Sequence, residues 1–153
     1  MGTMMEQKVD VEKLLAEGKT IQIKPQGYSM YPMFVPERDQ AVIAPVRIEK
    51  LKRGDVVLYR RSSGTLVLHR ILKRRPEGFY MVGDNQDEVE GPLSKKQIIG
   101  HMIRFVRKGR SYSVSNPVYR AAAGIWLFLR PVRRPVMRVG AFCKKIVCRK
   151  RKA

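Results

Sequence analysis

The fold is decided by residues 55–74, which read DVVLYRRSSGTLVLHRILKR. Branched and aromatic residues are dense in both halves of this segment, which predicts two strands, at 55–61 and 65–74. The short Ser62-Ser63-Gly64 stretch between them is typical of a hairpin turn. The segment therefore predicts an antiparallel β-hairpin.

Further strand signals lie on both sides of this hairpin. They occupy residues 20–24, 40–46, 78–82, 97–107 and 111–115. Seven or so short strands separated by turns predict a mainly β domain with a curled or barrel-like sheet. Ahead of the first strand, residues 10–17 show the pattern of a short amphipathic helix, with Asp10 as its N-cap and Gly18 as its stop.

After residue 115 the pattern changes from strands to helices. Asn116-Pro117 is typical of a helix start, and the apolar run 121–129 follows it. Beyond Pro135 the apolar residues recur at helical spacing, at Val136, Val139, Cys143 and Ile146. We therefore expect an N-terminal segment of residues 1–19, a β-domain of residues 20–115 and a helical tail of residues 116–153.

Charge is distributed unevenly along the chain. All 13 acidic residues lie at or before Glu90, whereas 17 of the 32 Lys and Arg residues follow it. The first ninety residues thus carry a net charge of +2, and the remainder carries +17. Such a basic end indicates a polyanionic partner, either nucleic acid or an anionic membrane, unless it serves only as a solvated surface.

The tail combines this charge with large apolar residues. Trp126, Phe128 and Phe142 lie among its Arg and Lys residues, a composition typical of helices that lie in a membrane interface. Packing of these helices against the β-domain is the alternative. Motifs that read or stack bases are not evident, and a basic tail alone would give salt-sensitive, unspecific binding to nucleic acid. We therefore expect an anionic membrane surface as partner and no nucleic acid.

Targeting and cofactor signals are sparse. The first 19 residues lack the continuous apolar core of a secretory signal peptide, and the apolar run 121–129 is shorter than the roughly 20 residues of a membrane span. Cys143 and Cys148 have the spacing of neither a redox pair nor a zinc half-site. We expect no metal and no cofactor, and a location on the cytoplasmic side of a membrane, at its surface, or in the cytoplasm.

A candidate nucleophile lies in Gly27-Tyr28-Ser29-Met30-Tyr31-Pro32, where the first strand ends. A serine hydroxyl is a weak nucleophile and needs an adjacent base. His69 is the candidate base, on a strand whose alternate residues place Val67 and Ile71 on the same face. Taken singly, a histidine among apolar neighbours is usually structural.

Four motifs occur in order along the chain, and together they carry more information than any one of them. They are Gly27-x-Ser29-Met30-x-Pro32, Leu51-x-x-Gly54-Asp55-Val56-Val57, His69-Arg70-Ile71 and Gly83-Asp84-Asn85. This succession resembles the type I signal peptidase family and, more distantly, the self-cleaving phage and SOS repressors. The resemblance covers residues 20–107.

The resemblance implies a role for each candidate residue. Ser29 would be the nucleophile, and His69 would be the general base, as in the archaeal and endoplasmic-reticulum branch of the family, where many bacterial members have Lys. Asp84 would be the third member; Glu90 is the alternative acid, with Asp87 and Glu88 between them. Such an enzyme cleaves a leader-like peptide or protein after small residues, with a Ser-His-acid mechanism.

The chain departs from the family pattern in two places. Gly27 stands where many members have a Ser that contributes to the oxyanion hole. Residues 1–19 do not show the apolar run of the family's usual N-terminal membrane anchor, so we expect no such anchor. The competing hypothesis is a catalytically inactive β-domain that binds an anionic membrane or nucleic acid through its basic tail.

Overall fold

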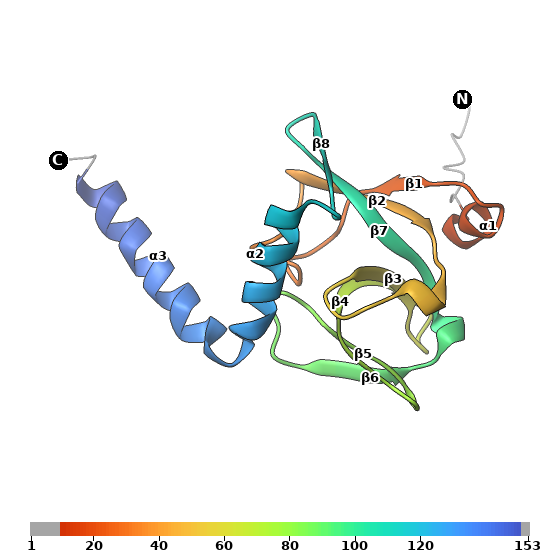
Figure 1. The fold of residues 1–153 in the computed structure, drawn as a ribbon. Helices are drawn as coiled ribbons and strands as arrows, with labels where there is room; N and C mark the ends of the chain where they lie inside the picture. Colours follow the sequence, from red (N-terminus) through yellow and green to blue (C-terminus); the bar gives the residue numbers. More distant parts are fainter. Residues whose placement is uncertain (1–9, 151–153) are drawn as a thin grey trace, which may run out of the picture.

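The structure is a computed structural model that describes the backbone of residues 10–150 and the side chains of residues 10–143. It consists of an antiparallel sheet with a short helix before it and helices after it (Figure 1). Its elements, in chain order, are α1 Val11–Ala16, β1 Ile21–Ile23, β2 Asp39–Pro45, η1 Ile48–Lys50, β3 Val56–Arg60, β4 Leu66–Arg75, β5 Gly78–Val82, β6 Val89–Leu93, η2 Lys95–Gln97, β7 Ile98–Arg107, β8 Arg110–Ser113, α2 Pro117–Phe128, η3 Arg130–Val132 and α3 Arg133–Lys150.

The strands form one eight-stranded sheet. Its order is β1-β2-β7-β3-β4-β5-β6, with β8 paired to β7 off this path. Within residues 10–150, β1 and β6 end the path and do not pair with each other, so the sheet is open. The prediction of a curled or barrel-like sheet is therefore wrong. The end strands are poorly suited to closure, because β1 has only three residues and Pro92 in β6 has no N–H to donate.

The predicted hairpin is confirmed as β3 and β4. Val57 pairs with His69 and Tyr59 with Val67, so these four side chains lie on one face of the sheet. The sequence interpretation missed β6, because it placed no strand between residues 82 and 97. Gly91 and Pro92 mask the strand signal, and both are tolerated there because β6 is an edge strand.

The sheet is buried on both faces at its centre. Alternate residues of β3 belong to two different clusters, with Val56 and Leu58 in the first and Val57 and Tyr59 in the second. The first cluster also holds Leu15 of α1 and Phe34 from the β1–β2 connection. The side chains at the centre of these strands, residues 56–59 of β3 and 68–71 of β4, are therefore shielded from water whichever face they point to.

The helices begin with the predicted caps. The Asp10 carboxylate accepts a hydrogen bond from the Lys13 N–H at 3.1 Å, and the Asn116 side chain accepts from the Val118 N–H at 2.8 Å. α2 lies beside the sheet, with Ala123 and Leu127 buried and the Tyr119 ring 5.5 Å from the ring of Phe105 on β7, whereas α3 extends away from the sheet (Figure 1).

α3 begins earlier than expected, at Arg133. It contains Pro135 in its first turn, where a missing N–H breaks no helical hydrogen bond. None of the helices in the part of the chain that the structure describes is both long and apolar enough to cross a bilayer.

Candidate active site

Ser29 and His69 line the same cavity. Its volume is about 330 Å³, and it lies between the β1–β2 connection, which carries Ser29, and the β3–β4 hairpin, which carries His69. Apolar side chains form much of its wall, from Ile23, Met30, Phe34, Leu58, Leu66 and Leu68. Within residues 10–150 no hydrogen bond joins the two candidate residues, but both face the same space.

The Ser29 turn is held by the segment after β5. The Asn85 N–H donates to the Ser29 carbonyl oxygen at 2.8 Å. A Cβ on Gly83 would lie 2.7 Å from this oxygen, so the close approach of the two segments requires glycine at position 83. Within the part of the chain that the structure describes, the N–H groups of Ser29 and Met30 donate no backbone hydrogen bond, which leaves them available to a ligand.

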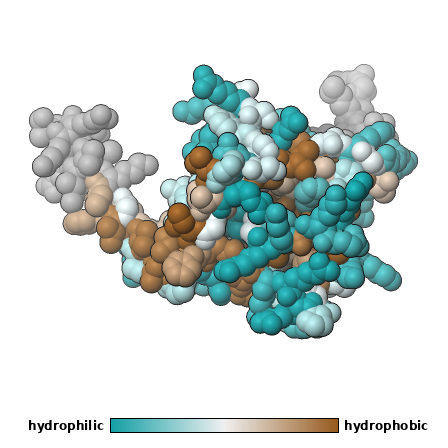
Figure 2. Space-filling view, viewed as in Figure 1, coloured by the Kyte–Doolittle hydropathy of each residue, from teal (hydrophilic) through white to brown (hydrophobic). Residues whose placement is uncertain are grey.

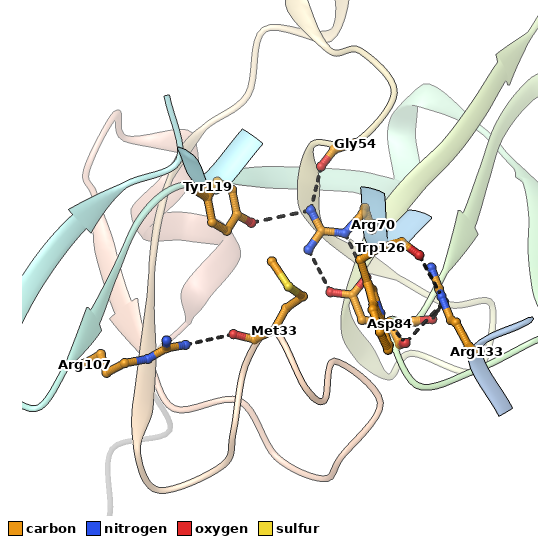
Figure 3. A network of polar contacts seen from close by, with 9 residues as sticks. Met33, Gly54, Arg70, Asp84, Arg107, Tyr119, Trp126 and Arg133 are labelled. Carbon is orange, nitrogen blue, oxygen red and sulfur yellow. Dashed lines mark hydrogen bonds and ion pairs between the residues drawn. The ribbon is translucent and has the colours of Figure 1, made fainter. Parts of the chain in front are cut away.

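The other motif residues form a buried ion pair beside this turn. Both carboxylate oxygens of Asp84 accept hydrogen bonds from Arg70, at 2.8 and 2.7 Å, and both side chains are completely buried (Figure 3). Arg70 also donates to the Gly54 carbonyl at 2.8 Å and to the Tyr119 hydroxyl at 3.4 Å. The second, third and fourth motifs thus meet at one point and support the Ser29 turn.

His69 is buried, with 3% of its surface exposed, and its Nδ1 lies 3.1 Å from the Tyr59 hydroxyl. The same hydroxyl donates to Glu90 Oε2 at 2.7 Å. Arg61 in turn donates two hydrogen bonds to Glu90, each of 2.8 Å. A chain of contacts therefore connects the imidazole to a carboxylate through a tyrosine.

This chain of contacts fixes the tautomer of His69. A tyrosine hydroxyl has one proton, and Tyr59 donates it to Glu90, so its oxygen accepts from Nδ1–H of the imidazole. The Nε2 lone pair is then free. Burial lowers the pKa of His69 to about 4, and hydrogen bonds from Arg61 lower the pKa of Glu90. At neutral pH the site therefore holds a neutral imidazole and an ionised carboxylate.

The acidic candidates have different partners in the structure. Asp84 pairs with Arg70, and Asp87 pairs with Arg134. Glu90 is the one linked to the imidazole through Tyr59. Glu88 lines a second cavity of about 330 Å³ whose wall also includes His69 and Glu90.

Two residues of this site were missed by sequence reasoning, Tyr59 and Arg61. The signal that could have found them is the register of the predicted hairpin. A three-residue turn at 62–64 sets Tyr59 opposite Val67, on the face that also carries His69.

Gly27 lines the same cavity as Ser29 and adopts a φ of 73°, a left-handed conformation that favours glycine. Gly27 thus replaces the serine of the family pattern, and its backbone conformation would strain a serine at this position.

Among the described residues, no group of three or more His, Cys, Asp or Glu side chains is placed to hold a metal ion. A scan against protein-family models found no match, and searches of the curated proteins and of the solved structures found none either.

Proposed function

We propose that this chain is a serine endopeptidase that resembles the signal peptidases and cleaves leader-like peptides after small residues. The observation that carries the proposal is the shared cavity of Ser29 and His69, with the imidazole held as a neutral base. We also propose that residues 20–115 form a β-domain of the signal-peptidase type.

In the proposed mechanism Ser29 Oγ attacks the scissile carbonyl carbon and gives its proton to His69 Nε2. The imidazolium is stabilised by Glu90, which acts through the Tyr59 hydroxyl. The oxyanion of the tetrahedral intermediate accepts hydrogen bonds from the N–H groups of Ser29 and Met30. Nε2 then protonates the leaving amine, so the peptide bond breaks and an acyl ester remains on Ser29. A water activated by His69 hydrolyses this ester and regenerates the free enzyme.

Glu90, rather than Asp84, is the acid in this proposal. The Arg70 guanidinium occupies both oxygens of Asp84, whereas Glu90 reaches the imidazole through one intervening hydroxyl. Asp84 then acts as a support of the Ser29 turn, through the adjacent Asn85 N–H.

The substrate preference follows from the surroundings of Ser29. β1 ends the sheet, and in the described part of the chain its outer edge is unpaired, so an extended peptide can add to it by main-chain hydrogen bonds. β1 leads directly into the residues that line the cavity, from Ile23 to Gly27. The apolar cavity wall suits small uncharged side chains next to the scissile bond.

The proposal is tested with His69→Ala and a pool of leader-like peptides that contain small residues at varied positions. We expect this variant to lose cleavage by about 10²–10⁴-fold, the usual contribution of a general base. Added imidazole should restore part of the rate, because the substitution opens space inside an existing cavity. Products are identified by mass spectrometry; wild-type rates in His69→Ala would contradict the assignment of the base.

Removing the tyrosine bridge should slow cleavage without removing the base. In Tyr59→Phe the imidazole loses the acceptor for Nδ1–H and its link to Glu90, so we expect kcat/KM to fall about 10²-fold. Tyr80→Phe is the matched control, because the Tyr80 hydroxyl donates to the exposed Glu77 near the β4–β5 turn. Equal values of kcat/KM for Tyr59→Phe, Tyr80→Phe and wild type would remove Tyr59 from the mechanism.

The pH dependence of cleavage should report the buried histidine. Because burial lowers the pKa of His69 to about 4, the base stays unprotonated down to that pH, and kcat/KM should decline only as the pH falls through about 4. Rates are compared with the recovery of activity after return to pH 7, which separates titration from unfolding. A midpoint at the ordinary histidine value of about 6.5 would show that the base is not buried in this way.

A further inference from the structure

The helices after the sheet carry an exposed apolar face. Six apolar side chains define this apolar helix face: Ile125, Phe128, Val132, Val136, Val139 and Phe142. Their exposed fractions run from 44% to 79%, and they recur every three or four residues from α2 through η3 into α3. Figure 2 shows apolar surface running along these helices. A single exposed apolar residue is ordinary, whereas a continuous stripe marks an interaction surface.

The opposite side of the helices is the one attached to the domain. Ala123 and Leu127 of α2 are buried, and the Trp126 Nε1–H donates to the Asp84 carbonyl at 2.9 Å. The buried Arg133 donates to the same carbonyl and to that of Gly83, each at 3.2 Å (Figure 3). These contacts fix the start of α3 on the domain, and they leave the apolar helix face turned away from it.

The charge around this face identifies the kind of partner. Residues 116–153 contain 11 Lys and Arg residues and no Asp or Glu. Nucleic acid would satisfy the charge but would leave the apolar stripe exposed to water. A bilayer with anionic headgroups satisfies both, because basic side chains reach the phosphates while apolar side chains enter the acyl boundary. We propose that the apolar helix face docks this protein on an anionic lipid surface.

The helices that carry the apolar helix face also contact the segment that supports the Ser29 turn. The Asp84 carbonyl bonded to Trp126 belongs to the residue before Asn85, whose N–H holds the Ser29 carbonyl. The docking proposal itself does not rest on catalysis, and its test contains no cleavage step.

The test is co-sedimentation of the full chain with vesicles. We expect binding to phosphatidylcholine vesicles that contain about 30% phosphatidylglycerol, little binding to pure phosphatidylcholine, and loss of binding as salt is raised. Phe128→Ser/Phe142→Ser should bind at least about tenfold more weakly, because two exposed aromatic rings no longer enter the bilayer. Tyr112→Ser, on the exposed strand β8, is the matched control and should bind as wild type.

A charge variant completes the test. Arg138→Gln should weaken binding about fivefold, the effect expected of one basic residue near an anionic surface, while Lys95→Gln on η2 should have no effect. The proposal is overturned if the wild-type protein does not sediment with the vesicles at low salt. The same conclusion holds if it binds nucleic acid but not the vesicles. Wild-type binding by the double phenylalanine variant would overturn it equally, since charge alone would then account for the association.

Discussion

Ser29→Ala should reduce the rate of peptide cleavage by at least about 10⁴-fold while the protein stays folded. The substitution removes the hydroxyl that attacks the carbonyl in the proposed mechanism, and alanine offers no nucleophile in its place. The fold should be unaffected because the Ser29 contact that holds the turn is made by its carbonyl oxygen, which accepts from the Asn85 N–H in either variant. Cleavage is measured with the best peptide from the pool, and folding by thermal melting.

The matched control for this prediction is Ser62→Ala. Ser62 is an exposed serine in the β3–β4 turn, so its loss should change neither cleavage nor melting. Cleavage by Ser29→Ala at more than a tenth of the wild-type rate would show that another residue is the nucleophile. A lowered melting temperature would show instead that the Ser29 side chain supports the turn.

Asp84→Asn should destabilise the protein by about 3–5 kcal/mol, the usual cost of leaving one member of a buried ion pair without its partner. The Arg70 guanidinium would remain completely buried beside a neutral amide that cannot accept two charge-assisted hydrogen bonds. The free energy of unfolding is measured by urea denaturation at neutral pH. Glu17→Gln is the control, because the ion pair of Glu17 with Lys19 is exposed and should contribute less than about 1 kcal/mol.

This prediction also separates the two acidic candidates. If Asp84 supports the Ser29 turn, its loss should appear mainly in the free energy of unfolding. Glu90→Gln should lower the rate of cleavage with a smaller change in stability, because Glu90 is only partly buried. A stable Asp84→Asn variant that has lost cleavage would return the catalytic role to Asp84.

The features of the fold that could be predicted from the sequence are those encoded locally. The hairpin of β3 and β4 follows from two apolar runs and a three-residue turn, and the helix starts follow from Asp10 and Asn116. The open sheet could not be predicted in this way, because closure depends on whether β1 and β6 meet. Strand β6 itself carries Pro92, which argues against a strand unless its edge position is known.

The candidate site likewise combines features that could be predicted locally with features that depend on long-range contacts. The order of the four motifs was enough to propose Ser29 and His69, which the structure places at one cavity. The choice between Asp84 and Glu90 depends on long-range register, since Glu90 lies on β6 and pairs with Met81 of β5. Without β6 as a strand, nothing in the sequence places Glu90 near Tyr59.

The most direct test of the proposed peptidase activity measures the masses of the protein and of the peptide products together. Wild type and Ser29→Ala are incubated with detergent and a pool of leader-like peptides containing small residues, quenched with acid and analysed by intact mass. We expect peptides cut after small residues by wild type only, and an acyl adduct on Ser29 whose added mass equals that of the N-terminal product less one water. Cleavage by both proteins, or by neither, would contradict the proposed mechanism.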